Sequence, residues 1–156
     1  MSKERIPNLK IENGKIFFKN FEGRPSKYNH EGDRNFCVEI EDPEEAQKMI
    51  DDGWNVKIRK PREDYEDDQP VYYIQVKVKF GGYPPKIVMV TKHSQTLLDE
   101  DSVIALDNAE ISSADMTITP YQWEVKGKEG ISAYLKTLYA NIEEDDWEDK
   151  YRHDDV

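Results

Sequence analysis

The stretch from Val71 to Phe80 most strongly constrains the fold, because its side chains alternate between two chemical kinds. Large apolar residues take one set of positions (Tyr72, Ile74, Val76, Val78 and Phe80), while a ring, an amide and two lysines take the other (Tyr73, Gln75, Lys77 and Lys79). A period of two with β-branched and aromatic residues predicts a half-buried β-strand, not a helix. The polar side is unusual, because residues 69–98 contain four lysines, one histidine and no carboxylate in a chain of formal net charge −11.

Length and composition are those of one globular domain with a large solvated surface. The chain has 156 residues, of which 37% are hydrophobic and 35% charged, enough to bury a core. A single cysteine, Cys37, excludes an internal disulfide and a cysteine-rich metal site, and it fits a reducing cytoplasm. No stretch resembles a signal peptide or a membrane span. We therefore expect a cytoplasmic protein with no membrane partner.

Further β-strands are expected on both sides of the central stretch. Alternation and short apolar runs predict strands over residues 9–20 (broken near Asn13-Gly14), 34–40, 54–60, 87–91, 110–119, 121–126 and 131–142. Asp42 followed by Pro43 predicts the start of a short helix that Gly53 ends, and a helical turn is expected over 99–106. The pattern predicts an all-β fold with one or two short helices. A helix between early strands favours an OB-fold-like Greek-key barrel over a sandwich.

Acidic residues are concentrated in the loop 63–68 and in the last segment, 143–156. That last segment holds eight acids against Lys150 and Arg152, a net charge of −6 that leaves −5 on the rest of the chain. Because few of its residues can be buried, we expect a flexible acidic tail after a domain over 1–142. Three roles stay open for this tail: solubility, docking of partner proteins, and competition with DNA for a basic groove.

Cations and rings share the polar sides of three predicted strands. These sides are Lys15, Phe17 and Lys19; Asn55, Lys57 and Arg59; and Tyr73, Gln75, Lys77 and Lys79. Single-stranded nucleic acid binds to cations along its phosphates and to flat rings beneath its bases. One such strand is explained well enough as a solvent-facing side, whereas three in one barrel leave both a solvent-facing side and a nucleic-acid-binding surface open. We place Phe18, Phe36, Trp54 and Phe80 in the core instead.

The chain also resembles the single-stranded DNA-binding proteins encoded by bacteriophages, of the compact kind with one OB-fold and an acidic tail. The resemblance runs from about residue 9 to 142 through ordered segments: NGKIFFKNF, GDRNFCVEI, DPEEAQKM, DGWNVK, YYIQVKVKF, PPKIVMVT, TLLDE and PYQWEVKGKEGISAYLKTLY. It implies sequence-independent binding of single strands in phage DNA replication or recombination. It also implies a tail that recruits replication or recombination proteins. Such tails often end on an aromatic residue, whereas this chain ends on Asp155-Val156.

The candidate site residues follow from strand alternation, because the resemblance contributes no residue-level motif. For DNA binding they are Lys15, Phe17, Lys19, Lys27, Tyr28, Arg34, Lys57, Arg59, Tyr73, Lys77, Lys79, Trp123 and Tyr134. For partner docking by the tail they are Glu143, Glu144, Asp145, Asp146, Trp147, Asp154, Asp155 and Val156. The expected partners are single-stranded DNA and replication or recombination proteins, and a homo-oligomer is compatible with this reading.

Catalysis is not predicted. Three histidines are scattered along the chain, and no metal-binding, phosphate-binding or nucleophile motif accompanies them. We therefore expect no catalytic residue, no metal and no cofactor. Two alternatives stay open. One is an acidic protein-interaction module or DNA mimic that acts through the loop 63–68 and the tail. The other is a metal-dependent nuclease, which would need a few fixed carboxylates rather than flexible runs of them.

Overall fold

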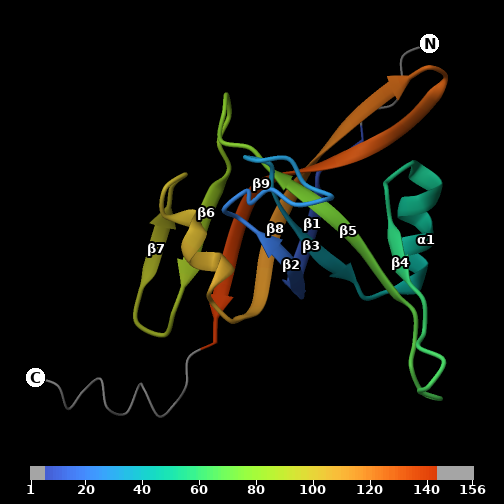
Figure 1. The fold of residues 1–156 in the computed structure, drawn as a ribbon, viewed down its shortest axis with the longest axis horizontal. Coiled ribbons are helices and arrows are strands. Elements are labelled where there is room, and N and C mark those ends of the chain that lie inside the picture. The colour runs from blue at the N-terminus through green and yellow to red at the C-terminus, as the bar shows by residue number, and fades with distance from the viewer. Residues whose placement is uncertain (1–5, 144–156) are drawn as a thin grey trace, which may run out of the picture.

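A computed structural model describes residues 6–143, which form nine strands, one α-helix and one 3-10 helix (Figure 1). In chain order these are β1 (Leu9–Gly14), β2 (Ile16–Asn20), β3 (Arg34–Ile40), α1 (Pro43–Asp52), β4 (Lys57–Arg59), β5 (Val71–Val78), β6 (Lys86–Val90), β7 (Gln95–Leu98), η1 (Val103–Asp107), β8 (Ile111–Val125) and β9 (Lys128–Ile142). No helix within 6–143 is long and apolar enough to cross a membrane.

The sheet closes into a barrel through one bent strand. The hydrogen-bonded order is β1-β8-β9-β5-β3-β2, and only Lys15 separates β1 from β2 along the chain. The two ends of the sheet are therefore halves of one strand, which pairs with β8 first and with β3 next. β5 and β9 pair in parallel, and the other neighbours in this order are antiparallel. The predicted OB-fold-like barrel is confirmed.

The bend itself lies where the sequence predicted a break. The β1–β8 register shifts between Ile11 and Gly14, and Asn13 takes a left-handed φ of 53°. Gly14 is buried, and a Cβ there would lie 2.8 Å from Ile11 Cγ2 and 3.1 Å from Val38 Cγ2. Only glycine leaves room for the strand to turn so close to β3.

The barrel interior holds the residues that alternation assigned to it, with one exception. Phe36, Val38, Ile74 and Val76 are buried, as is Trp54. Phe80 is only partly buried at the edge of this core, because β5 ends at Val78. The placement of Phe18 in the core was wrong, since 71% of that residue is exposed.

The local predictions for the helix are confirmed in detail. The Asp42 carboxylate accepts from the Glu44 N–H at 3.0 Å, Pro43 occupies the first turn, and Gly53 ends the helix at a φ of 105°. The predicted break at Pro120 is wrong, because β8 runs without interruption through this residue. β1 pairs with β8 only as far as Ile118, so Pro120 lies where β8 is an edge strand and needs no second ladder.

An appendage, residues 86–110, extends the sheet on the side of the barrel opposite α1 (Figure 1). β6 pairs in parallel with β9 at residues 137–141, just beyond the point where β5 pairs with Ala133 and Tyr134. β7 then pairs with β6, a strand that the sequence did not predict, and η1 follows. The expected helical turn over 99–106 corresponds to η1, shifted by a few residues.

Candidate nucleic-acid interface

The outward side chains of β2, β3, β4, β5 and β9 form one continuous surface, here called the outer face. Cross-strand pairing arranges them in rows: Glu39, Tyr73 and Lys57; Phe17, Cys37 and Gln75; Asn35, Lys77 and Tyr134. Because paired residues point to the same side of a sheet, each row lies on this face. The fold therefore brings together three predicted rings (Phe17, Tyr73 and Tyr134) and two predicted cations (Lys57 and Lys77).

Three aromatic rings gather at one end of the outer face. The Phe17 and Tyr73 centroids lie 5.1 Å apart, and the Phe17 and Phe18 centroids 4.9 Å apart, both edge to face. Phe18 joins this group because its φ of 50° is left-handed and the β2–β3 register shifts after Phe17. Alternation fails at such a residue, so the sequence reading missed Phe18 as a surface ring.

A second aromatic group consists of Tyr134 on β9 and Tyr121 on β8, and two lysines lie next to it. The ammonium groups of Lys77 and Lys79 lie 5.7 and 5.6 Å from the Tyr134 ring centroid. Tyr121 meets the same ring at 5.9 Å. Within residues 6–143, neither lysine takes part in an ion pair. These two positive charges are therefore exposed beside flat rings, which is the combination that nucleic acid binds.

The outer face continues along the β8–β9 hairpin, which extends beyond the barrel (Figure 1). Trp123 lies opposite Gly130, and a Cβ on Gly130 would lie 2.6 Å from Trp123 Cζ2. The glycine lets the indole lie flat across the neighbouring strand. Trp123 remains partly exposed there, on the same side of the hairpin as Tyr121.

Between the two aromatic groups, the outer face carries amides. The Gln75 Nε2 donates to Asn35 Oδ1 at 3.2 Å, and the Asn35 Nδ2 donates to Asn29 Oδ1 at 3.0 Å. This chain of amides links β5 and β3 to the loop 22–33, here called the β2–β3 loop. Sequence reasoning did not identify Asn35, because its partner Gln75 lies 40 residues away, and it did not identify Asn29, whose contacts belong to an irregular loop without periodicity.

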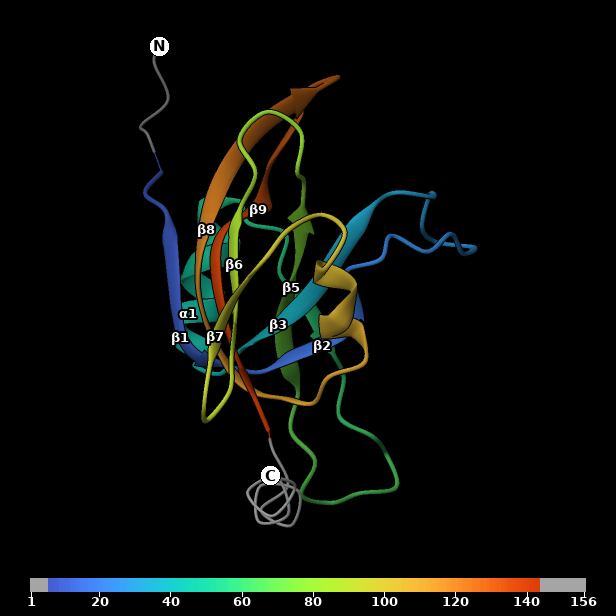
Figure 2. The ribbon, with the colours of Figure 1, turned by 90° about the vertical axis from the view of Figure 1, so that its left-hand side faces the viewer.

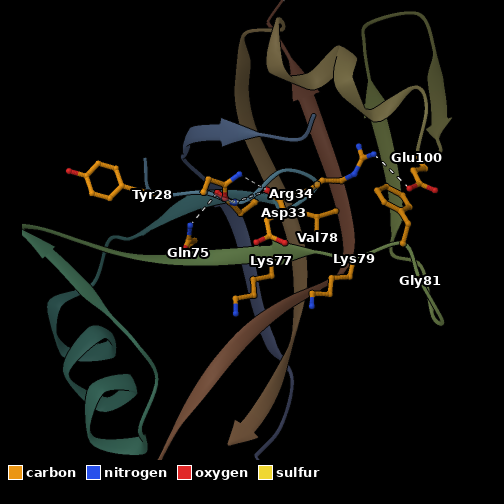
Figure 3. A pocket seen from close by; sticks show the side chains of 13 residues that line it. Tyr28, Asp33, Arg34, Gln75, Lys77, Val78, Lys79, Gly81 and Glu100 are labelled. Carbon is orange, nitrogen blue, oxygen red and sulfur yellow. Dashed lines mark hydrogen bonds and ion pairs between the residues drawn. The ribbon is translucent and has the colours of Figure 1, made fainter. Parts of the chain in front are cut away.

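Two adjoining hollows follow this line of amides. A cleft of about 510 Å³ is lined by Tyr28, Asn29, Gly32, Asp33, Arg34, Asn35, Gln75, Lys77, Val78, Lys79, Phe80, Gly81 and Glu100 (Figure 3). A second hollow of about 650 Å³ shares four of these residues and reaches Phe18. Figure 3 shows Lys77, from β5, and Lys79, just after β5, extending to the same side. The hollows make a groove from Phe18 to Lys77 and Lys79, the two lysines that lie over Tyr134.

The β2–β3 loop carries two predicted site residues at the rim of this groove. Tyr28 is 90% exposed, and the Lys27 ammonium lies 5.7 Å from its ring centroid. Tyr83, two residues after Gly81 in the turn that follows β5, is 99% exposed, a ring that the sequence analysis did not select. Its signal was the Gly81-Gly82 pair before it, which marks a turn, and turns lie on the surface.

Two predicted cations have their charged groups bound within the protein, although Lys19 still lines the second hollow. The Lys19 ammonium donates to the carbonyls of Leu106 (2.8 Å) and Ala109, so its expected alignment with Phe17 was wrong. Burial lowers the pKa of Lys19, while the charges of Asp107 and Glu110 oppose that shift. The physical reason is the left-handed residue before it, which turns β2 out of alternation.

The other is Arg59, whose guanidinium donates to the Asp68 carboxylate at 3.2 and 3.4 Å. The Arg59 side chain, followed by the Arg62 N–H, holds the pKa of Asp68 well below its usual range. The acidic loop 63–68 thus folds back on a cation that alternation had assigned to DNA.

Of the remaining predicted cations on the barrel strands, Arg34 lines the cleft, whereas Lys15 and Lys57 line neither hollow. The Arg34 guanidinium lines the cleft but donates to the Phe21 carbonyl at 2.7 Å and pairs with Glu100 at 3.8 Å. Lys15 is exposed 3.9 Å from Glu41. Lys57 shares a row with Tyr73 and lies near Cys37. Burial raises the pKa of the Cys37 thiol, and the positive charge of Lys57 opposes that shift.

The acidic tail falls almost entirely outside the described part of the chain. Of its candidate residues, only Glu143 is described; it is exposed, and its N–H donates to the Glu110 carbonyl at 2.8 Å. Glu144, Asp145, Asp146, Trp147, Asp154, Asp155 and Val156 lie beyond the described residues. Among residues 6–143, no three His, Cys, Asp or Glu side chains are grouped as a metal site requires.

The closed barrel with rings and cations on this face defines the class of protein, an oligonucleotide-binding barrel. A profile of the phage ssDNA-binding domain family matches residues 1–155, and the chain belongs to this family. The resemblance seen in the sequence is thereby confirmed.

Solved structures with the same fold come from bacteriophage Enc34. Its single-stranded DNA-binding protein in complex with ssDNA matches with a TM-score of 0.56 and 12% identity over 88% of each chain. A C-terminally truncated form matches with a TM-score of 0.53 and 15% identity over 88% of this chain and 87% of that one. No curated protein sequence matches this chain.

Proposed function

We propose that this protein binds single-stranded DNA without sequence preference along the outer face, in phage DNA replication or recombination within the cytoplasm of the host bacterium. The observation that carries the proposal is the meeting of partly exposed rings on β2, β5 and β9 with the exposed lysines Lys77 and Lys79. In OB-folds the second and third barrel strands, here β3 and β5, and the adjoining loops form the usual oligonucleotide-binding surface. Membership of the phage family supports the same activity.

In this proposal the single DNA strand follows the groove between the two aromatic groups. Bases stack on Phe17, Phe18 and Tyr73 at one end and on Tyr121 and Tyr134 at the other. Lys77 and Lys79 neutralise phosphates between them, since both ammonium groups are exposed in the cleft. Stacking accepts every base, which accounts for binding without sequence preference.

The test is a titration of a fluorescent dT oligonucleotide with the full-length protein at rising salt. Each phosphate neutralised on a single strand contributes a slope of about −0.7 to log K against log salt. With about three contacts, affinity should fall roughly 20-fold between 50 and 200 mM salt. Duplex DNA should bind more weakly, because paired bases cannot stack on the rings. Failure to bind any single strand, with capture of a basic protein instead, would favour the DNA-mimic alternative.

We further propose that the tail competes with DNA for the outer face and docks replication or recombination proteins. A variant ending at Glu143 loses seven acids and two bases, a net charge of −5. If the tail competes as proposed, removing acids that repel the DNA phosphates should raise the affinity for single-stranded DNA about threefold to tenfold at low salt. The gain should vanish at high salt, where such interactions are screened. An unchanged affinity at low salt would contradict competition. Partner docking is tested separately, by a pull-down of replication or recombination proteins with the tail.

A further inference from the structure

Residues of the β2–β3 loop line the groove, yet no strand within residues 6–143 pairs with the loop between Glu22 and Asp33, which extends away from the barrel (Figure 2). We propose that Asp107, Lys19 and Arg34 are positioning residues, through which the appendage holds this loop in its DNA-binding position. The inference rests on the proposed function and reassigns two predicted DNA ligands. It makes the appendage a determinant of affinity that need not touch the strand.

Asp107 fixes the point where β2 becomes the loop. Its Oδ1 accepts from the Phe21 N–H at 2.8 Å, and its Oδ2 accepts from the Glu22 N–H at 2.9 Å. Two successive backbone donors are thus satisfied by one carboxylate from the end of η1. Such charge-assisted bonds are about twice as strong as neutral ones. The direction in which the chain leaves the barrel is therefore set by the appendage.

Lys19 fastens the same junction from the opposite side. Its ammonium donates to the carbonyls of Leu106 and Ala109, the residues on either side of the Asp107 turn. Because an ammonium group has three donors, these two bonds leave little capacity for a phosphate. Lys19 and Asp107 thus form a clasp of four hydrogen bonds, in which residues 19–22 supply every donor and residues 106–109 every acceptor.

Arg34 ties the other end of the loop to the appendage. Its guanidinium donates to the Phe21 carbonyl at 2.7 Å, pairs with Glu100 at 3.8 Å, and lies 5.3 Å from the Phe80 ring centroid. The Arg34 side chain is only 16% exposed, so it acts mainly inside the protein. Both ends of the loop therefore depend on residues 100–109.

The clasp reaches the groove through the neck of the loop. The Gly32 N–H donates to the Gly23 carbonyl at 2.8 Å and closes that neck. Beyond it, Asn29 donates to the carbonyls of Arg24 and Asp33 at 2.8 and 3.0 Å and accepts from Asn35 on β3. Displacement of the neck would carry Tyr28 and Asn29 away from the cleft that they line.

The test is Asp107→Ala in the full-length protein. Loss of the negative charge and loss of the positioning role predict opposite changes in affinity for single-stranded DNA. Removal of an acid near a DNA site should tighten binding to a polyanion. Loss of the clasp should instead weaken binding of a dT oligonucleotide, by about tenfold, because the loop must then be ordered when DNA binds. Hydrogen exchange at residues 22–33 should accelerate at least tenfold while β5 and β9 stay protected. Asp107→Asn, which keeps one acceptor, should give a smaller change of both kinds.

Matched controls separate positioning from other roles. Asp101→Ala removes the same charge from an exposed part of the appendage, and affinity should stay equal or rise. Lys77→Met should reduce the salt slope by about 0.7, whereas Lys19→Met should weaken binding with the slope unchanged. An equal loss of slope in Lys19→Met would overturn the proposal, as would unchanged affinity of Asp107→Ala beside a wild type that binds. If the wild type does not bind DNA, the proposed function fails, and hydrogen exchange still tests the clasp.

Discussion

Replacing Lys77 and Lys79 together by glutamate is expected to reduce affinity for single-stranded DNA about 100-fold at physiological salt. Two charges 4 Å apart interact by about 1 kcal/mol in water and by more near a protein surface. Reversal turns two attractions into two repulsions of similar size, so the total is about 4 kcal/mol before screening. About 3 kcal/mol should remain, which corresponds to roughly two decades in Kd.

The loss should come mainly from charge, because both lysines are exposed and the barrel does not depend on them. Thermal unfolding of the variant should therefore match that of the wild type within a few degrees. A control variant, Lys10→Glu with Lys48→Glu, changes charge equally on β1 and α1, outside the outer face. If this control loses as much affinity as the first variant, binding would depend on net charge and the groove would not be the site.

Replacing Phe18 by glycine is expected to stabilise the fold and weaken DNA binding at the same time. Phe18 combines a left-handed φ of 50° with 71% exposure, so its conformation is costly and its ring contributes little to the core. Glycine adopts this backbone freely, which should raise the free energy of unfolding by about 1 kcal/mol. Removal of a stacking ring should cost about 1–3 kcal/mol of binding, roughly 5- to 150-fold in Kd.

The two effects can be measured separately, by urea unfolding and by titration of a dT oligonucleotide. Strained residues persist mainly where the surroundings or the function require them. A gain in the free energy of unfolding together with a loss of DNA affinity would identify function as the reason for the strain at Phe18. Tyr65→Ala provides the control, because it removes an exposed ring from the acidic loop and should leave affinity unchanged. Unchanged binding in Phe18→Gly would exclude this ring from the site.

Much of the fold could be predicted from local pattern. Alternation through Val71–Phe80 identified β5 and its buried side, and Asp42, Pro43 and Gly53 identified both ends of α1. These features depend on neighbours within a few residues, where covalent geometry and capping act directly. β7 and the unbroken course of β8 through Pro120 escaped prediction, because both depend on which strand lies alongside.

For the candidate site, the sequence by itself determined which side of each regular strand carries rings and cations, because a β-strand must alternate. Phe17, Tyr73 and Lys77 were correctly placed on one surface for this reason. Only the tertiary structure decided which charged groups are already engaged: Lys19 meets carbonyls 87 and 90 residues away, and Arg34 meets Glu100. It also decided that Phe18 faces solvent, since a single left-handed residue reverses the alternation. Long-range partners and local backbone reversals leave no periodic trace in a sequence, so they become visible only when the chain is folded.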